Sequence, residues 1–121
     1  MAGSLTLSTL SDGTNSTSAT NAIRGSAKAW VNFDGSTGSI FAAYNVSSVT
    51  RNSTGLYTVN FTNAFSDIYY SCVGTGDGYG GSFGHIVAWE ASTTTTFQFS
   101  TWRNSNNARG DSGWISISAF R

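Results

Sequence analysis

Short segments in which apolar and polar residues alternate recur along most of the chain, and this period of two constrains the fold more than any other feature. Side chains of a β-strand point alternately to its two faces, so alternation gives one apolar and one polar face. In "AWVNFD" the residues Ala29, Val31 and Phe33 would face a core, and "WISISAF" repeats the pattern. Apolar spacings of three and four, which indicate helices, are nearly absent. The sequence therefore predicts an all-β fold with antiparallel strands.

Turn residues between these segments divide the chain into about seven or eight strands. "DGSTG" (34–38) predicts a hairpin in which Gly35 and Gly38 can adopt positive φ, and "TRNSTG" (50–55) predicts another. Proline is absent, so the turns depend on Gly, Asn, Asp and Ser. We predict an antiparallel, jelly-roll-like β-sandwich with strands near 26–34, 39–46, 56–63, 68–74, 83–91, 95–102 and 113–120.

Residues 1–25 do not follow this pattern. "SDGTNSTSATNAIRG" is polar, small and non-periodic, so it cannot bury enough surface to fold by itself. "LTLSTL" ahead of it alternates Leu5 and Leu7 with polar residues, and could form a strand if a partner supplied the pairing. We expect residues 1–25 to be an attachment or assembly segment and residues 26–121 to be the folded domain.

Composition and charge argue against several classes of protein. Charged residues make up 10% of the chain, against roughly 25% in typical globular proteins. Six basic and six acidic residues cancel, so no net field attracts nucleic acid or anionic lipid. No apolar run is long enough to span a membrane, and "MAGSLTLSTL" lacks the features of a secretion signal. The single cysteine, Cys72, allows no intrachain disulfide, which favours assembly inside a cell or stability gained by oligomerisation.

Two short motifs suggest chemistry that their context does not support. The tract "GTGDGYGGSFG" (74–84) contains a G-x-G-x-x-G pattern, but an alternating segment follows it where a dinucleotide site needs a helix. We predict a long β–β loop that displays Tyr79 and Phe83. "RGD" at 109–111 can be an integrin ligand, but all three residue types are common in turns, and we favour a plain turn.

Neither a metal site nor a catalytic site is expected. His85 is the only histidine, and with Cys72 and scattered carboxylates it forms no tetrahedral zinc set. It shares a predicted strand face with Val87 and Trp89, so a packed or interfacial role is favoured. The carboxylates lie mostly in predicted turns, and no G-x-S-x-G elbow is present. We expect no enzymatic activity and no cofactor.

Tryptophan lies on the polar side of three predicted strands. Trp30 shares its face with Asn32 and Asp34, opposite the predicted core residues of the same strand. Trp102 and Trp114 also lie off the apolar faces of their strands. Large apolar side chains in such places mark either an interface or a ligand platform.

One long stretch resembles a known family. "GSAKAWVNFDGSTGSIFAAYNVSSVTRNSTGLYTVNFTNAFSDIYYSCVG" is similar to a domain found in tail-fibre and other appendage proteins of tailed bacteriophages. In that family an "AWVNF" strand, a glycine hairpin, "YNVSSVT" and a "G-x-YTVNF" strand follow in this order. "LTLSTLSDGTNSTSAT" also resembles the start of short, stand-alone members, and "ISISAFR" resembles their final strand. The resemblance covers about residues 3–74 and 113–121.

The resemblance implies a homotrimeric virion component that is assembled in the bacterial cytoplasm. A β-sandwich tip domain would be held outward, and the N-terminal trimer-assembly segment would face another virion protein. The family pattern brings no catalytic residue and no cofactor. If the chain follows it, the expected subunit-interface residues are Leu5, Leu7, Trp30, His85 and Trp114, with Trp30 covered by a neighbouring subunit or by the second sheet.

The loops 74–84 and 103–113 match no part of the family pattern, and such loops on a rigid scaffold are where binding specificity tends to lie. Aromatic faces suit sugars, and Asn and Arg supply hydrogen bonds. We therefore expect attachment to a host-surface glycan or protein, through Tyr79, Phe83, Trp102, Arg103, Asn104, Asn106 and Arg109. Two alternatives stay open: a head fibre, decoration or cement protein with a structural role, and a stand-alone carbohydrate-binding module.

Overall fold

The computed structural model describes residues 3–77 and 85–121, with the side chains of residues 85 and 86 outside the description. The chain folds into an antiparallel β-sandwich, which confirms the predicted fold class. Two four-stranded layers form it. The first, in spatial order, is β4 (Ile40–Tyr44), β3 (Ala27–Phe33), β11 (Ile115–Phe120) and β7 (Ser71–Gly76). The second is β8 (His85–Ser92), β9 (Thr96–Arg103), β6 (Leu56–Phe61) and β5 (Val46–Ser53).

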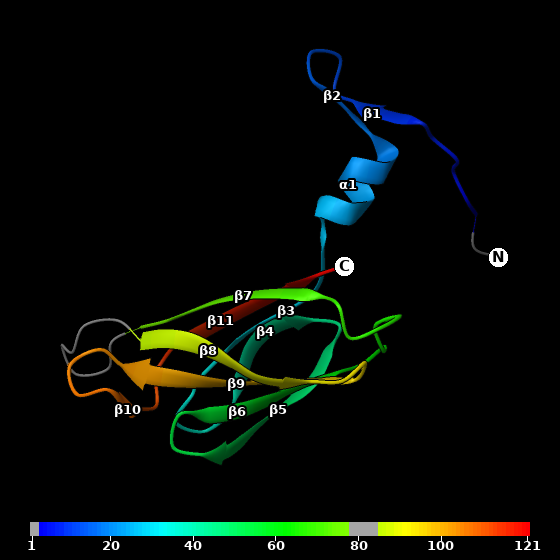
Figure 1. The fold of residues 1–121 in the computed structure, drawn as a ribbon. Helices are drawn as coiled ribbons and strands as arrows, with labels where there is room; N and C mark the ends of the chain where they lie inside the picture. Colours follow the sequence, from blue (N-terminus) through cyan, green and yellow to red (C-terminus); the bar gives the residue numbers. More distant parts are fainter. Residues whose placement is uncertain (1–2, 78–84) are drawn as a thin grey trace.

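Within residues 3–77 and 85–121, strand pairing joins the two layers where Gly76 of β7 pairs with His85 of β8. Strands β9, β8 and β7 follow one another as antiparallel neighbours, and β6 returns to lie beside β9. This order, β6-β9-β8-β7, is a Greek key. Figure 1 shows β7, β11 and β3 as one layer above β9, β6 and β5.

Alternation along the strands places the core as predicted. Ala29, Val31 and Phe33 are buried on β3, with no more than 1% of their surface exposed. Phe33 packs against facing rings of the other layer, with ring centroids 5.4 Å from Tyr57 and 6.3 Å from Phe99. The remaining buried apolar residues are Val59, Phe61, Phe65, Phe97, Ile115, Ile117 and Ala119. The apolar half of each alternating segment thus fills one core between the layers.

The predicted strand 39–46 is wrong in one respect, because the chain turns a corner at Asn45. This residue has a φ of 55°, and β4 ends before it while β5 begins after it. Its side-chain amide donates to the carbonyl of Lys28 at 3.1 Å, and its Oδ1 accepts from the amide nitrogen of Asn63 at 2.8 Å. The corner carries the chain from the first layer to the second. Residues 50–53, predicted as turn, therefore belong to strand β5.

Two further boundaries differ from prediction. Strand β7 begins at Ser71, three residues later than predicted, because the segment before it closes an end of the core. There Phe65 is buried and stacks on Tyr70 with ring centroids 4.4 Å apart. The predicted loop 103–113 contains a short strand, β10 (Ala108–Arg109), which pairs with the end of β9.

Residues 1–25 were expected not to fold alone, yet the described part forms a hairpin and a helix. Strands β1 (Thr9–Ser11) and β2 (Ser16–Ser18) pair, and α1 (Ala19–Gly25) follows. Local hydrogen bonds explain these elements: Asp12 Oδ1 accepts from the amide of Asn15 at 2.7 Å, and Ser18 caps the helix. This N-terminal unit projects from the side of the sandwich formed by β7, β11 and β3, beside the C-terminus (Figure 1).

Candidate functional site at the distal loops

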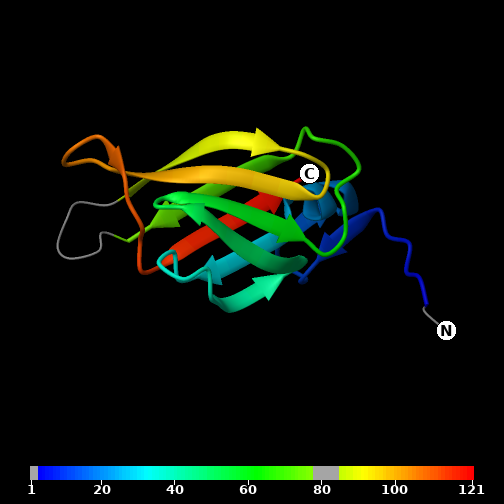
Figure 2. The ribbon, with the colours of Figure 1, turned by 90° about the horizontal axis from the view of Figure 1, so that it is seen from below.

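Four connections gather at the end of the sandwich away from the N-terminal unit, and we call this the distal end. Strands β3, β5, β7 and β9 all run toward it, because neighbouring strands are antiparallel and β3 starts beside the N-terminal unit. Figure 2, seen from below, places the segment around β10 opposite the N-terminus as well. The described residues of the distal end are 34–39, 54–55, 77 and 104–114.

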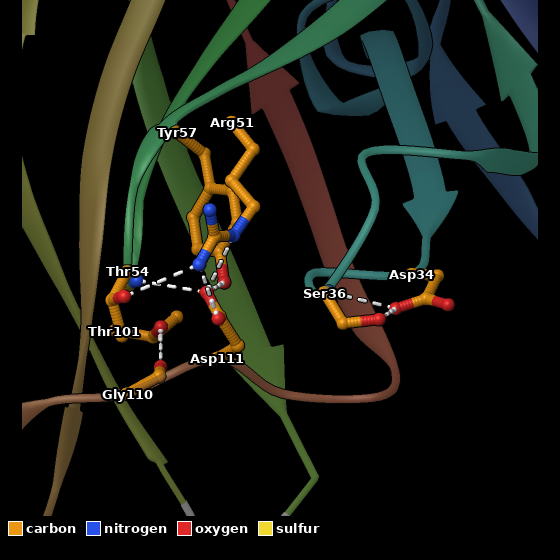
Figure 3. Close-up of polar contacts among 9 residues, drawn as sticks. Asp34, Ser36, Arg51, Thr54, Tyr57, Thr101, Gly110 and Asp111 are labelled. Carbon is orange, nitrogen blue, oxygen red and sulfur yellow. Dashed lines mark hydrogen bonds and ion pairs between the residues drawn. The ribbon is translucent and has the colours of Figure 1, made fainter.

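Asp111 holds two of these connections together. Its Oδ1 accepts hydrogen bonds from Arg51 Nε at 3.1 Å, the Gly55 amide at 2.9 Å and the Tyr57 hydroxyl at 2.8 Å. Its Oδ2 accepts from Arg51 Nη2 at 2.7 Å. Figure 3 shows Arg51 and Tyr57 converging on the carboxylate from neighbouring strands. One side chain thus links β5, the β5–β6 turn, β6 and the segment before β11.

The electrostatics of this network fix its protonation at neutral pH. Burial raises the pKa of Asp111, but hydrogen bonds from Arg51, the Gly55 amide and Tyr57 outweigh it, so the pKa lies below its usual 3.8. Burial and the bond to Asp111 raise the pKa of Tyr57 well above its usual value of 10.0. The carboxylate is therefore ionised and the phenol protonated, as the observed hydrogen bonds require.

Two glycines let the distal connections approach closely. Gly55 has a φ of +64°, and a Cβ there would lie 2.6 Å from the amide nitrogen of Gly110. A Cβ on Gly35 would lie 2.5 Å from the carbonyl oxygen of Ser112. The 34–38 hairpin is confirmed, and Gly38 has the positive φ that was predicted, at +79°. Gly35 is needed for space and does not adopt a positive φ.

The RGD tripeptide is part of the scaffold, because both of its charged side chains have partners within the chain. Arg109 Nη2 donates to Glu90 Oε1 at 2.7 Å, and its guanidinium carbon lies 5.5 Å from the ring centroid of Trp102. Asp111 is held by the network described above. The predicted plain turn is wrong, because Arg109 belongs to strand β10 and the turn lies before it, at residues 104–107.

The predicted contact residues fall into three groups. Tyr79 and Phe83 lie outside the described residues. Asn104 and Asn106 are exposed in the turn between β9 and β10, while Trp102, Arg103 and Arg109 are half-buried. Trp102 donates through Nε1 to Ser100 Oγ at 2.7 Å on the outer face of β9.

A small cavity of ≈ 210 Å³ lies at the distal end. Of the predicted contact residues it includes Arg103, whose side chain lies across Gly110: a Cβ on that glycine would be 2.2 Å from Arg103 Nε. Its other lining residues were not predicted as site residues, and they come from two connections, 34–39 and 104–114. The cavity is lined by Ser36, Arg103, Asp111, Ser112 and Gly113.

The predicted interface residues that the structure describes are all exposed. Leu5 is 82% exposed and Leu7 45%, both in the N-terminal unit. Trp30 is 37% exposed on the outer face of β3, where it pairs in register with Ser118 and Tyr44, so coverage by the second sheet is wrong. Trp114 is 51% exposed, and its ring stacks on that of Phe41, which is also half-exposed. The side chain of His85 lies outside the description, and burial of the set by other subunits stays a prediction.

A second cavity, of ≈ 200 Å³, opens between β7 and β8 where the layers separate. It is mainly apolar, and Cys72 on its wall has a pKa that burial raises to about 12. Val87 packs against the core, whereas Trp89, predicted to share its face, is 67% exposed at the rim.

Among residues 3–77 and 85–121, no group of three or more His, Cys, Asp or Glu side chains could hold a metal ion. In the same part of the chain, no helix is both long and apolar enough to cross a bilayer. Comparisons with protein-family models, with curated proteins and with solved structures found no match.

Proposed function

We propose that the chain is a non-enzymatic, homotrimeric fibre or spike protein of a tailed-phage particle, and that its distal end attaches the particle to the host surface. The resemblance of its sequence to phage appendage domains suggests this class of protein. One observation carries the proposal: the N-terminal unit projects from the side of the sandwich beside the C-terminus, away from the distal loops (Figures 1 and 2). A protein held on a particle through this unit keeps its distal loops away from the point of attachment.

The N-terminal unit has the surface expected of an assembly segment. Leu5, Leu7, Leu10 and Ile23 are 45–82% exposed, and all of them line a groove of ≈ 390 Å³. A small unit that leaves this much apolar surface in water gains stability when copies of it pack together. This unit is therefore the place where we expect the three chains to associate.

The outer face of the first layer supports association as well. Trp30, Phe41, Tyr44 and Trp114 are all at least 37% exposed, and most other side chains on this face are small and uncharged. The exception is Lys28, whose Nζ donates to the Ser26 carbonyl at 2.7 Å and to that of Ile23 at the end of α1. An uncharged aromatic face on the same side as α1 extends the proposed contact between subunits.

Adsorption to bacteria tests the proposal. The purified whole chain is added in excess to cells of the bacterium whose phage encodes it, before phage is added. The chain should bind the cells and reduce phage adsorption, because it occupies the same surface receptors. As a control, cells resistant to the phage through loss of a surface glycan should not bind the chain.

Unchanged adsorption in the presence of saturating free protein would rule out the attachment role. If the chain were then found to raise the thermal stability of the particle, the decoration alternative would replace the proposal. Light scattering coupled to size-exclusion chromatography supplies the companion measurement, with an expected mass of about three times the 12.7 kDa of one chain.

A further inference from the structure

The distal cavity is lined by Arg103, whose guanidinium group is not paired with any residue that the structure describes. The other arginine side chains near the distal end are paired: Arg51 with Asp111 at 2.7 Å and Arg109 with Glu90 at 2.7 Å. Arg103 makes no ion pair or side-chain hydrogen bond with any residue that the structure describes. Its five N–H donors remain available beside a cavity.

The position of Arg103 is fixed although its charge is not used. Its side chain lies across Gly110, with a Cβ position on that glycine only 2.2 Å from Nε and 2.7 Å from Cγ. Gly110 is itself held by hydrogen bonds to Thr101, from its amide at 3.0 Å and to its carbonyl at 2.5 Å. A guanidinium held against a rigid backbone loses little conformational entropy when it binds a ligand.

The same cavity also offers hydrogen-bond acceptors. Asp111 Oδ1 already accepts three hydrogen bonds. Its Oδ2 accepts one, from Arg51, and can therefore accept another from a ligand. The Ser36 hydroxyl donates to Asp34 Oδ1 at 2.6 Å, which leaves its own lone pairs to accept. Neighbouring donors and acceptors of this kind match the adjacent hydroxyls of a sugar, each of which both donates and accepts.

Charge selects between classes of sugar. Asp111 is neutralised by Arg51, but Asp34 beside Ser36 is ionised, because hydrogen bonds from Ser36 lower its pKa. The positive charge of Arg103 is thus offset by the negative charge of Asp34 beside the same cavity. The cavity therefore has no excess positive charge that would favour an anionic sugar over an uncharged one.

The size of the cavity agrees with a sugar ring. At ≈ 210 Å³ the cavity is smaller than the roughly 300 Å³ at which pockets for drug-sized ligands begin, so it suits one ring. Its lining is polar apart from Gly113, so hydrogen bonds to the hydroxyl groups of the ring would supply the binding.

We infer that the cavity lined by Ser36, Arg103 and Gly113 binds one uncharged pyranose unit of a surface glycan, with Arg103 as donor and Asp111 and Ser36 as acceptors. This inference rests on the proposed attachment function and assigns it a ligand class. A shallow site for a single ring binds weakly, with a dissociation constant of the order of millimolar.

The test is a titration of the isotopically labelled whole chain, followed by amide and arginine Nε–H correlation spectra. The probes are the methyl glycosides of glucose, galactose, mannose and N-acetylglucosamine, with methyl glucuronide and inorganic phosphate as anionic probes. At least one neutral glycoside should shift the signals of Ser36, Gly113 and the Arg103 Nε–H. Arg103→Gln should weaken that binding roughly tenfold or more, because a charged hydrogen-bond donor is lost.

Arg24→Gln is the matched control, since it makes the same change of charge on the exposed helix α1. Ser36→Ala is a second variant, which keeps the inference testable if Arg103→Gln fails to fold. The inference is overturned if no neutral glycoside shifts these signals, if Arg103→Gln binds as wild type does, or if the anionic probes bind as well as the neutral ones.

Cell adsorption separates this inference from the proposed function. If wild-type chain adsorbs to cells and Arg103→Gln adsorbs equally well, the sugar site is wrong and the attachment role stands. If a neutral glycoside binds at Arg103 but the chain does not adsorb, the site stands and the proposed attachment fails.

Discussion

At the scale of single residues, Asp111 has the largest structural role that the sequence did not reveal. Its partners Arg51, Gly55 and Tyr57 are more than 50 positions away in the chain, and no motif relates them. The sequence favoured a plain turn at the RGD tripeptide and predicted no partner for its carboxylate. In the fold this carboxylate joins the β5–β6 turn to the segment before β11.

Asp111→Asn should destabilise the domain by roughly 2–3 kcal/mol, because Arg51 and Tyr57 lose a charged acceptor in a half-buried place. Urea unfolding at neutral pH measures the change. Asp12→Asn, at an exposed carboxylate of the N-terminal unit, is the control and should have little effect on the sandwich. Equal effects of the two substitutions would contradict the role assigned to Asp111.

The same substitution should alter the response to acid. The pKa of Asp111 is lower in the folded chain than in the unfolded chain, so its contribution is complete above the unfolded value and lost as pH falls through the folded value. Wild type should therefore lose more stability than Asp111→Asn as the pH falls from about 5 to about 2. Parallel stability curves over this range would show that the carboxylate is not stabilised by folding.

Cys72 should be inert in the native chain. Burial raises its pKa to about 12, so the thiolate that reacts with disulfide reagents is scarce. At about pH 8, labelling of native protein by such a reagent should be roughly a hundredfold slower or more than labelling in guanidinium chloride. Rapid stoichiometric labelling without denaturant would mean that the cavity between β7 and β8 is open to solvent.

At the scale of elements, the distal turns depend on space that only glycine leaves. Gly55→Ala should destabilise the chain by at least about 2 kcal/mol, because it combines a left-handed φ with a Cβ 2.6 Å from the Gly110 nitrogen. Gly25→Ala is the matched control, since no atom lies within 4 Å of its Cβ position. Thermal unfolding of the two variants gives the comparison, and a neutral Gly55→Ala would show that the turn can relax.

The N-terminal unit should control assembly without supporting the sandwich. Replacing Leu10 and Ile23 by Asp places charge on side chains that are 53% and 64% exposed in the single chain. We expect this double variant to be monomeric by light scattering, with the near-ultraviolet circular dichroism of the sandwich retained. A variant that remains trimeric would show that the contact between subunits lies elsewhere.

The elements that could be predicted are those whose signal is local. Alternation in "AWVNF" and "ISISAF" identifies β3, β11 and their core faces, since one face of each is buried throughout. The corner at Asn45 could not be predicted, because the bonds that hold it come from Lys28 and Asn63, 17 and 18 positions away. Of the candidate site, Arg103 and Gly113 share the predicted loop 103–113, but Ser36 comes from another connection and is brought to it by topology alone.

At the scale of the whole molecule, the N-terminal unit and the distal end of the sandwich differ in the polarity of their surfaces. The N-terminal end exposes apolar side chains such as Leu5 and Ile23, which water disfavours. The distal end exposes hydroxyl, amide and guanidinium groups around one small cavity. An attachment protein that points outward needs such a difference between its two parts. The proposal therefore predicts which part of the molecule meets the particle and which part faces solvent.

Cryo-electron microscopy of intact phage particles tests that consequence most directly. We predict threefold density in which the N-terminal units meet the particle and the distal loops, including residues 104–114, point into solvent. Density with the outer face of β4, β3 and β11 lying flat on a capsid or tail shell would contradict the attachment account and indicate a decoration protein.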